Sequence, residues 1–290
     1  MFKNLTMSFI GGGVMAEAMI SGLLRCDVLK PGQILTSEPR SERGKELQDR
    51  YGVRWTADNA QAAHEADLLV LSIKPQVLDK VLPEIRAGAT SSALVLSIVA
   101  GAQIRRIANG VANAKVVRAM PNTPARIGQG ITVWTATPEV PEQQREQARA
   151  ILSALGEEVF VDTEDYLDMA TALSGTGPAY VFMFMEAMID AGVHLGFSRH
   201  VAEKLVLQTM RGSVEYAATA GLHPAVLRNQ VTSPGGTSAE AIYHLEKGGM
   251  RTVISRAVWA AYQRSVALGS GDKVSSRLAG RDPENGGNGQ

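Results

Sequence analysis

The sequence predicts two domains of different class, an α/β domain in the first part of the chain and an all-α domain in the second. From the N-terminus to about Val161, short apolar runs of strand length alternate with helical patterns, as in a parallel sheet with right-handed crossovers. Beyond that residue the strand pattern disappears, and Ala, Met, Val and Leu recur at helical spacing. We therefore expect an α/β domain over residues 1–161, a helical domain over 162–270, and a disordered tail over 271–290, which is rich in Gly, Asp, Ser and Asn.

The strands and helices of the first domain follow from these patterns in chain order. Two of the strands, Leu68–Ile73 and Leu94–Val99, are almost entirely apolar, as expected of strands that are covered on both faces. Strands are expected at Leu5–Ile10, Gln33–Ser37, Arg54–Thr56, Leu68–Ile73, Leu94–Val99, Lys115–Arg118, Ile131–Thr135 and Glu158–Val161. Helices are expected at Ser41–Tyr51, Gln61–Ala66, Val77–Ile85, Ile104–Ala108 and Glu142–Leu155, after a first helical run that contains Met15, Met19 and Leu23.

Glycine and proline divide the second domain into helices. The expected helices are Tyr166–Leu195, Arg199–Ala220, Ala225–Val231, Ser238–Lys247 and Arg251–Leu268. Within the first of them, Gly175, Gly177 and Pro178 disfavour a helix, by about 1 kcal/mol for each Gly and about 3 kcal/mol for Pro relative to Ala. A break of this cost indicates a functional segment, and a bundle of this size often packs against a second copy of itself.

The composition excludes several classes of protein. The 290 residues carry 29 basic and 29 acidic side chains, so no net charge draws the chain to nucleic acid or to an anionic membrane. The single cysteine, Cys26, cannot form a disulfide within the chain and favours a reducing compartment. No apolar run is long enough to cross a bilayer and no signal peptide is evident, so we expect a cytoplasmic protein. The five histidines show no metal-ligand spacing, and no Ser-His-Asp order suggests a catalytic triad.

A dinucleotide fingerprint follows the first expected strand. Gly11, Gly13 and Ala16 give the spacing G-x-G-x-x-A, in which alanine takes the place of the third glycine. Gly11 allows a tight turn, Gly13 lets a pyrophosphate approach the backbone, and Ala16 keeps the helix close to the strand. Because the motif lies after an expected strand and before a helical run, we interpret it as a dinucleotide site and not as a chance match.

A second anion site is predicted within Thr232–Ala241, whose sequence is Thr-Ser-Pro-Gly-Gly-Thr-Ser-Ala-Glu-Ala. Pro234 ends the preceding helix, and the two glycines after it allow a sharp turn. We expect Thr237 or Ser238 to cap the next helix, with Glu240 completing a capping box if Thr237 is the cap. The N–H groups of such a helix start suit a small carboxylate or phosphate, although an ordinary capped loop would have the same pattern.

Two further loops follow expected strands at the carboxyl edge of the sheet, where ligands bind in open α/β folds. Lys74, in the sequence Lys-Pro-Gln, is either an anion or ribose contact or a solvated surface lysine. The loop Met120–Pro124 is held by two prolines, and its Asn122 and Thr123 can hydrogen-bond an amide such as nicotinamide unless the loop is a plain turn.

The chain resembles the pyrroline-5-carboxylate reductase family over roughly residues 5 to 270. The resemblance is carried by motifs in the family's order and spacing, namely Phe9–Ala18, Lys74–Gln76, Met120–Ala125, Leu173–Phe182 and Thr232–Ile242. The last of these is the family's most specific motif. One position departs from it: the family's usual threonine, two residues after the second glycine, is Ser238 here, which keeps the hydroxyl and loses the methyl group.

The resemblance implies an activity and a set of roles. The family reduces the cyclic imine 1-pyrroline-5-carboxylate to L-proline by hydride transfer from NADPH or NADH. Its members are homodimers through the helical half, and dimers often build a decamer. The implied substrate contacts are the N–H groups of Gly235, Gly236 and Thr237 with the carboxylate, and the catalytic Ser238 with the ring nitrogen. The implied cofactor contacts are Gly11, Gly13, Val14 and Met15 with the pyrophosphate, Asn59 and Lys74 toward the ribose, and Pro121 and Asn122 toward the nicotinamide.

The choice between NADH and NADPH depends on the end of the second strand. An acid there, Glu38, accepts the ribose 2′-hydroxyl and repels a 2′-phosphate, which favours NADH. Arg40 and Arg43 follow closely and can hold that phosphate. The family leans to NADPH, so both cofactors remain open.

Three alternative functions share part of this sequence pattern. A β-hydroxyacid dehydrogenase would need a catalytic lysine in the first long helix of the second domain, and Tyr166–Leu195 contains none. A nucleotide-sensing protein without enzymatic activity would not explain the second anion site. A reductase of a related cyclic-imine carboxylate remains open.

Overall fold

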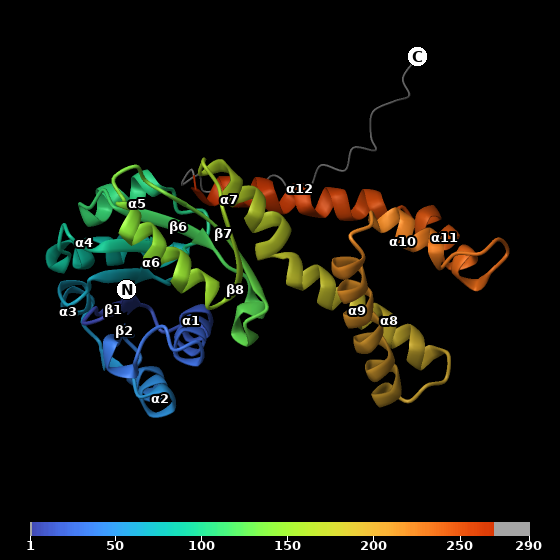
Figure 1. Ribbon diagram of the computed structural model, residues 1–290, viewed down its shortest axis with the longest axis horizontal. Coiled ribbons are helices and arrows are strands. Elements are labelled where there is room, and N and C mark those ends of the chain that lie inside the picture. The colour runs from blue at the N-terminus through green and yellow to red at the C-terminus, as the bar shows by residue number, and fades with distance from the viewer. Residues whose placement is uncertain (1, 270–290) are drawn as a thin grey trace, which may run out of the picture. The chain divides into compact units, whose positions relative to one another are not determined.

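The computed structural model describes residues 2–269, and the chain divides into two units (Figure 1). The first unit runs to Gly175 and resumes at Ala261, whereas the second comprises Thr176–Ala260. This division differs from the predicted boundary at residue 161, because a helix after the sheet and the end of the last helix pack with the first unit. The predicted tail, residues 271–290, lies outside the described residues.

The first unit is built on an eight-stranded sheet in the order β3-β2-β1-β4-β5-β6-β7-β8. Its strands are β1 Met7–Ile10, β2 Ile34–Ser37, β3 Arg54–Thr56, β4 Leu68–Leu71, β5 Leu94–Ser97, β6 Val116–Met120, β7 Gly130–Ala136 and β8 Gly156–Phe160. All neighbouring pairs are parallel except β6 with β7. The predicted α/β class is confirmed, but β7 runs in the opposite direction because the connection from Met120 to Gly130 is too short for a crossover helix.

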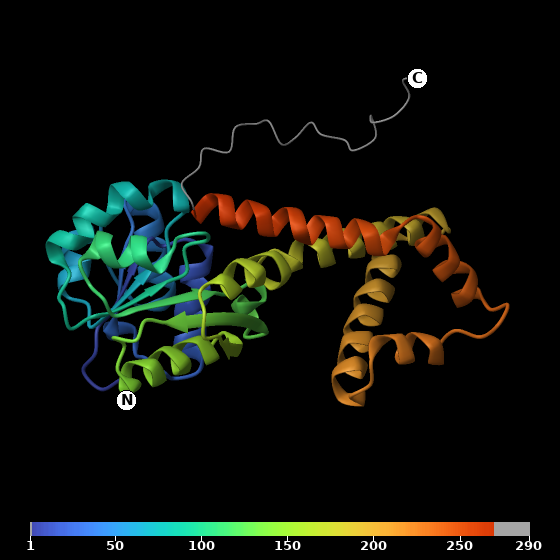
Figure 2. The same ribbon diagram turned by 90° about the horizontal axis from the view of Figure 1, so that it is seen from above.

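Helices cover both faces of this sheet (Figures 1 and 2). They are α1 Val14–Arg25, α2 Ser41–Tyr51, α3 Asn59–His64, α4 Leu78–Gly88, α5 Ile104–Val111, α6 Glu142–Ser153 and α7 Asp165–Ala170. Short 3₁₀ helices lie at η1 Pro31–Gln33, η2 Pro75–Val77 and η3 Thr123–Ile127.

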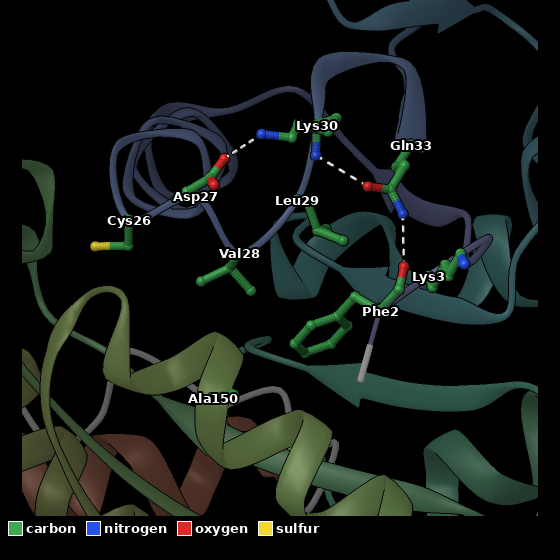
Figure 3. A pocket seen from close by; sticks show the side chains of 9 residues that line it. All are labelled: Phe2, Lys3, Cys26, Asp27, Val28, Leu29, Lys30, Gln33 and Ala150. Atoms are coloured by element: carbon green, nitrogen blue, oxygen red, sulfur yellow. Dashed lines mark hydrogen bonds and ion pairs between the residues drawn. The ribbon is translucent and has the colours of Figure 1, made fainter.

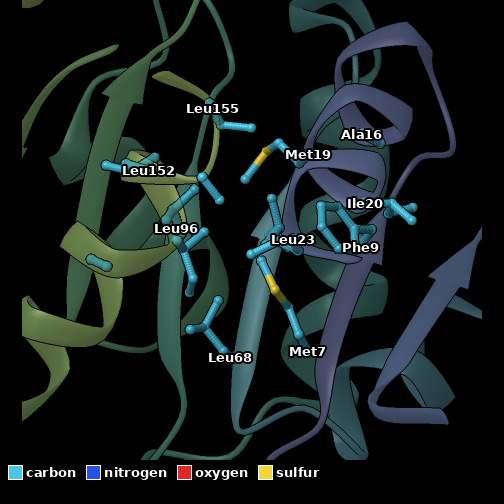
Figure 4. Packing of buried hydrophobic residues seen from close by; sticks show 14 of the residues in the cluster. Met7, Phe9, Ala16, Met19, Ile20, Leu23, Leu68, Leu96, Leu152 and Leu155 are labelled. Atoms are coloured by element: carbon cyan, nitrogen blue, oxygen red, sulfur yellow. The ribbon is translucent and has the colours of Figure 1, made fainter. Parts of the chain in front are cut away.

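Two hydrophobic cores lie on opposite faces of the sheet, because successive strand residues point to opposite sides. Met7 and Phe9 of β1 pack in one core with Met19 and Leu23 of α1 (Figure 4), whereas Ile10 packs in the other. The apolar strands are therefore buried on both faces of the sheet, as their sequences predict.

The second unit is helical, as predicted, with α8 Gly177–His194, α9 Arg199–Ala220, α10 Pro224–Gln230, α11 Thr237–Lys247 and the first part of α12 Met250–Gly269. The expected long helix Tyr166–Leu195 is broken into α7, a π-helical turn at Thr171–Gly175 (η4) and α8. Within Thr176–Ala260 only Ala202 and Val206 are buried. Large apolar side chains such as Phe182 and Met183 are 60% and 74% exposed, so this unit has little core of its own.

A buried arginine attaches the later segments of the first unit to its sheet. Arg118 of β6 is 1% exposed, and its Nη1 and Nη2 donate to Glu164 and Asp168 at 2.7 and 3.3 Å. The Ser265 hydroxyl of α12 donates to the same Asp168 oxygen at 2.6 Å. Both carboxylates thus meet on one strand residue, and the serine bonds one of these carboxylates.

Two features that would bear on function are absent from residues 2–269. No helix there combines the length and the apolar character needed to cross a membrane. The same residues contain no group of three His, Cys, Asp or Glu side chains arranged to hold a metal ion.

Candidate functional site

The loop Gly11–Gly13, which we call the glycine loop, joins β1 to α1. Gly11 has a φ of +98°, and its N–H donates to the Ser37 carbonyl at 2.8 Å. The Ser72 hydroxyl donates to the Gly11 carbonyl at 2.8 Å. A Cβ at Gly11 would lie 2.9 Å from Ile73 Cγ2, so both the backbone conformation and the space require glycine.

Gly13 is the N-cap of α1, and no side chain caps this helix. A Cβ placed on Gly13 would meet no atom within 4 Å, so open space lies next to the helix N-terminus. The first N–H groups of a helix lack partners within it and attract anions. The glycine loop therefore fits the pyrophosphate of a dinucleotide, as the fingerprint predicts, with Val14 and Met15 supplying the next N–H groups.

Glu38 lies directly after β2 and is 5% exposed. Its Oε2 accepts from the Gly12 N–H at 3.0 Å, and its Oε1 accepts from the backbone N–H and Nε of Arg40 at 3.2 and 2.8 Å. Burial opposes ionisation of Glu38, but the hydrogen bonds from Arg40 and Gly12 outweigh it and lower the pKa. The structure thus brings a charged carboxylate to the glycine loop.

The two arginines near Glu38 differ in how their side chains are held. Arg40 is ion-paired with Glu38, and 71% of its side chain is exposed. Arg43 is 16% exposed and bonds the Gly12 carbonyl, Glu17 and Glu46. The sequence suggested that both arginines could hold a 2′-phosphate. Of the two, only Arg40 is accessible for that role.

The other predicted cofactor residues have mixed surroundings. Lys74 is exposed at the start of η2. Asn59 is engaged on both sides, since its Oδ1 accepts from the Ser37 hydroxyl and its Nδ2 donates to Glu84, each at 2.7 Å. Asn59 therefore lies at the end of β2, and Lys74 follows the end of β4.

The Asn122 side chain, predicted to contact the nicotinamide amide, already bonds other parts of the protein. Asn122 is 9% exposed and follows the buried Pro121. Its Oδ1 accepts from the Ile131 N–H at 3.0 Å, and its Nδ2 donates to the Ser174 carbonyl at 3.2 Å. Its side chain therefore holds β7 and η4 to the loop, and the loop backbone and the exposed Thr123 are left as candidate contacts for a nicotinamide.

The predicted second anion site corresponds to the start of α11, and the cap of this helix differs from the prediction. Gly236 is the N-cap, with no side-chain cap, because its carbonyl accepts from Ala239 and Glu240 at 3.1 and 3.2 Å. Thr237 is consequently the first helical residue, and the predicted capping by Thr237 or Ser238 is wrong.

The turn before α11 also changes one predicted substrate contact. Gly235 has a φ of +70°, and a Cβ there would meet nothing within 4 Å. The Gly236 N–H donates to the Ser233 carbonyl at 3.0 Å, so it is not free for a carboxylate in this conformation. The N–H groups of Gly235 and Thr237 stay predicted carboxylate contacts, and within Thr176–Ala260 no side chain binds the Ser238 hydroxyl.

A pocket at the opposite end of α1 is separate from these groups (Figure 3). It is lined in part by Cys26, Asp27 and Lys30, which follow the C-terminus of α1. Its Gln33 amide donates to the Phe2 carbonyl at 2.7 Å, and Lys30 is ion-paired with Asp27. Gln33, Lys30 and Asp27 of this pocket therefore already have partners within it.

Sequence reasoning missed one charged residue next to the glycine loop. Glu17, in the first turn of α1, accepts from Arg43, Arg50 and Tyr51. An acid directly after a dinucleotide fingerprint was the only signal for it. Nothing in the sequence indicated which residues of the next helix it binds.

The fold and the glycine loop define a dinucleotide-binding oxidoreductase with a helical second domain. Residues 164–268 match the family described as pyrroline-5-carboxylate reductase dimerisation, and residues 6–101 match the family described as NADP oxidoreductase coenzyme F420-dependent. A pyrroline-5-carboxylate reductase from Synechocystis sp. is 44% identical over 92% of this chain and 99% of its own length. The protein of that name from Corynebacterium melassecola is 40% identical over 91% and 98%.

A solved structure gives the same result. The Plasmodium falciparum pyrroline carboxylate reductase, with NADP bound, has a TM-score of 0.85 and 32% identity over 92% of this chain and 99% of its own. The chain belongs to the pyrroline-5-carboxylate reductase family. It is an NAD(P)H oxidoreductase that converts 1-pyrroline-5-carboxylate to proline, and its dimerisation domain makes it a homo-oligomer. The predicted family, fold class and activity are confirmed.

Proposed function

We propose that the start of α11 is the substrate site for this reduction and that Ser238 is its catalytic residue. The observation that carries the proposal is a helix N-terminus with a glycine N-cap and no side-chain cap, preceded by the exposed Gly235. The free N–H groups of Gly235 and Thr237 bind the substrate carboxylate, because a helix start stabilises negative charge. The Gly236 N–H donates to the Ser233 carbonyl and so supports the turn, and it is not used for the substrate.

The Ser238 hydroxyl, one residue into the helix, bonds the ring nitrogen of the bound imine. Reduction adds a hydride to the C=N carbon and leaves a secondary amine, and the reduced nicotinamide supplies that hydride. The protein therefore has to position the imine and stabilise its charges, for which little acid–base machinery is needed. This agrees with the polar groups of the Ser233–Ser238 segment, none of which is a strong base.

We propose the glycine loop as the cofactor site. Its uncapped helix start, with Gly11, Gly13, Val14 and Met15, suits the pyrophosphate, and the carboxylate of Glu38 suits a ribose hydroxyl. Arg40 is the accessible cation for a 2′-phosphate. The remaining contacts are Asn59 and Lys74 toward the ribose, and Pro121 with the Asn122 backbone toward the nicotinamide. Both NADH and NADPH are expected to serve.

We further propose that the homo-oligomer is a dimer through the helical unit, that dimers assemble into a decamer, and that the protein is cytoplasmic. The exposed apolar side chains of the second unit, including Phe182, Met183 and Leu205, support a covered surface. A single free cysteine supports a reducing compartment. Light scattering of the full chain distinguishes monomer, dimer and decamer.

The substrate proposal is tested with the purified chain, NADH or NADPH, and racemic 1-pyrroline-5-carboxylate, by following the nicotinamide absorbance. Ser238→Ala is expected to lower kcat/KM for the imine about 5- to 150-fold, as for one lost hydrogen bond at a polar site, with unchanged cofactor affinity. Ser238→Thr, which restores the hydroxyl, should retain most activity. An alanine variant as fast as the parent would refute the role. The six-membered and 2-carboxylate imines in the same assay test the related cyclic-imine alternative.

A further inference from the structure

The peptide groups of Gly12, in the middle of the glycine loop, are held on both sides by charged side chains. Glu38 accepts from the Gly12 N–H at 3.0 Å, and Arg43 Nε donates to the Gly12 carbonyl at 2.9 Å. The first comes from the end of β2 and the second from α2. The loop conformation is thus set by side chains from outside it, as well as by its own glycines.

Arg43 is in turn held by the buried carboxylate of Glu17. Glu17 is 11% exposed and receives three donors: Arg43 Nη2 at 2.5 Å, and Arg50 Nη1 and the Tyr51 hydroxyl at 2.8 Å each. Burial opposes ionisation of Glu17, but the bonds from Arg43 and Tyr51 and the charge of Arg50 lower its pKa. A charged carboxylate of α1 therefore fixes the position of an arginine on α2.

All three nitrogens of the Arg43 guanidinium have partners. Nε bonds Gly12, Nη2 bonds Glu17, and Nη1 bonds Glu46 at 2.7 Å. Glu46 is 55% exposed, so its pair with Arg43 is solvated and contributes little. The buried bond to Glu17 is the one that decides where Arg43 points.

We propose that Glu17 is a positioning residue for the cofactor and a determinant of cofactor choice. By holding Arg43 on the Gly12 carbonyl, it preforms the glycine loop and withholds Arg43 from a 2′-phosphate. Arg40, already paired with Glu38, is then the single arginine at this strand end that a 2′-phosphate can reach without breaking a buried ion pair. This inference rests on the cofactor site proposed above.

This arrangement favours NADH over NADPH. A 2′-phosphate brings about two negative charges to a strand end that already carries Glu38. Binding it with two arginines would require Arg43 to leave both Gly12 and Glu17. NADH, which lacks the phosphate, leaves the Glu17–Arg43–Gly12 chain of bonds intact and is favoured by it.

The test compares the full-length parent with two variants, Glu17→Gln and the matched control Glu46→Gln. For each protein, fluorescence titration gives the affinity for NADH and for NADPH. Both substitutions remove one carboxylate from Arg43, but only the first removes the buried one. We expect Glu17→Gln to weaken NADH binding and to raise the NADPH/NADH affinity ratio about tenfold, as for one charge-assisted hydrogen bond. Glu46→Gln should leave both affinities within about twofold of the parent.

A second background shows whether Glu17 acts through Arg43. In an Arg43→Met protein, Glu17→Gln should no longer change the NADPH/NADH ratio, because the arginine that it releases is gone. Tyr51→Phe, which removes another donor of Glu17 and leaves Arg43 in place, reports on folding and should not move the ratio.

The outcomes separate this inference from the cofactor site itself. An unchanged ratio in Glu17→Gln, or the same change in the Arg43→Met background, overturns the role of Glu17. Loss of both cofactors by equal factors also overturns it, because a purely structural role would have that effect. If Gly13→Val leaves cofactor binding intact, the cofactor site is wrong, whatever Glu17 does.

Discussion

The N-termini of α1 and α11 have nearly the same backbone conformation, but different contacts hold the turns that precede them. Their N-caps, Gly13 and Gly236, have φ and ψ of −72° and −177° and of −80° and 165°, and neither helix has a side-chain cap. Around the first, Glu38 and Arg43 bond the loop from β2 and α2. The turn before the second is closed by a backbone bond between Gly236 and Ser233.

The comparison shows that one kind of anion site can be built in two ways. The glycine loop depends on contacts between residues far apart in the sequence, so its geometry is coupled to the folding of the sheet. The turn before α11 depends on local backbone geometry, so a substitution there should change substrate binding without disturbing the cofactor. The predictions below test this separation.

The largest effect is expected for Gly13→Val. Its side chain would fill the open space beside the α1 N-terminus, so cofactor affinity should fall more than about 100-fold while the protein still folds. Fluorescence titration with NADH and NADPH measures this. Gly32→Val is the matched control, since a Cβ at Gly32 also meets nothing within 4 Å but lies in η1. Equal affinities in the two variants would remove the glycine loop from the cofactor site.

A smaller change is expected for Glu38→Ser, which removes the negative charge next to the glycine loop. The kcat/KM ratio should shift toward NADPH by about tenfold, mostly through KM, because the ribose contact is the same in the ground and transition states. Arg40→Ala should shift it the other way. An unchanged ratio in the serine variant would mean that Glu38 serves Gly12 alone and not the ribose.

Gly235→Ala should act on the second site alone. Alanine at a φ of +70° costs about 1–2 kcal/mol, although the added Cβ has room. We expect that loss in denaturant unfolding together with a raised KM for the imine and unchanged cofactor affinity. Gly221→Ala, at a φ of +62° and equally open, is the control: it should lose similar stability and keep its KM. A raised KM in both variants would indicate a general effect of destabilisation.

The smallest effect concerns pH. The pKa of Glu38 is lowered in the folded protein, so the stability that it contributes is present above its ordinary pKa of about 4.5 and is lost as the pH falls toward the folded value. Glu38→Gln should therefore lose less stability than the parent as the pH is lowered from 7 to well below 4.5 in urea unfolding. Ser238→Ala, in the other site, should keep the parent's pH dependence; a Gln variant with that same dependence would argue against the charged Glu38.

The sequence predicts well what depends on local patterns. The sheet strands, the glycine loop and the helix break at Gly175–Pro178 each follow from a few adjacent residues. Predictions that depend on exact bonding fared less well. Thr237 has the right chemistry for a cap, but the Gly236 carbonyl already accepts the first helical bonds. The Asn122 amide has the right chemistry for nicotinamide, but Ile131 and Ser174 use it.

The reversed β7 has a signal in the sequence, since the predicted strands Lys115–Arg118 and Ile131–Thr135 are joined by too few residues for a crossover helix. Contacts between helices far apart in the chain left no such signal. The bonds of Glu17 to α2 depend on how two helices meet, which no periodicity reveals.

The buried Arg118 bears on how the chain is completed during synthesis. Its partners Glu164 and Asp168 are made after the whole sheet, and Ser265, which bonds Asp168, comes about 100 residues later still. A ribosome delivers the chain in that order, and domains generally fold as they emerge. A nascent chain ending at residue 161 therefore has Arg118 without its carboxylates, and leaving a buried charge unpaired costs about 3–5 kcal/mol. The dinucleotide-binding unit begins first and finishes last, so its final form becomes available only when the helical segment between its two parts has already been made.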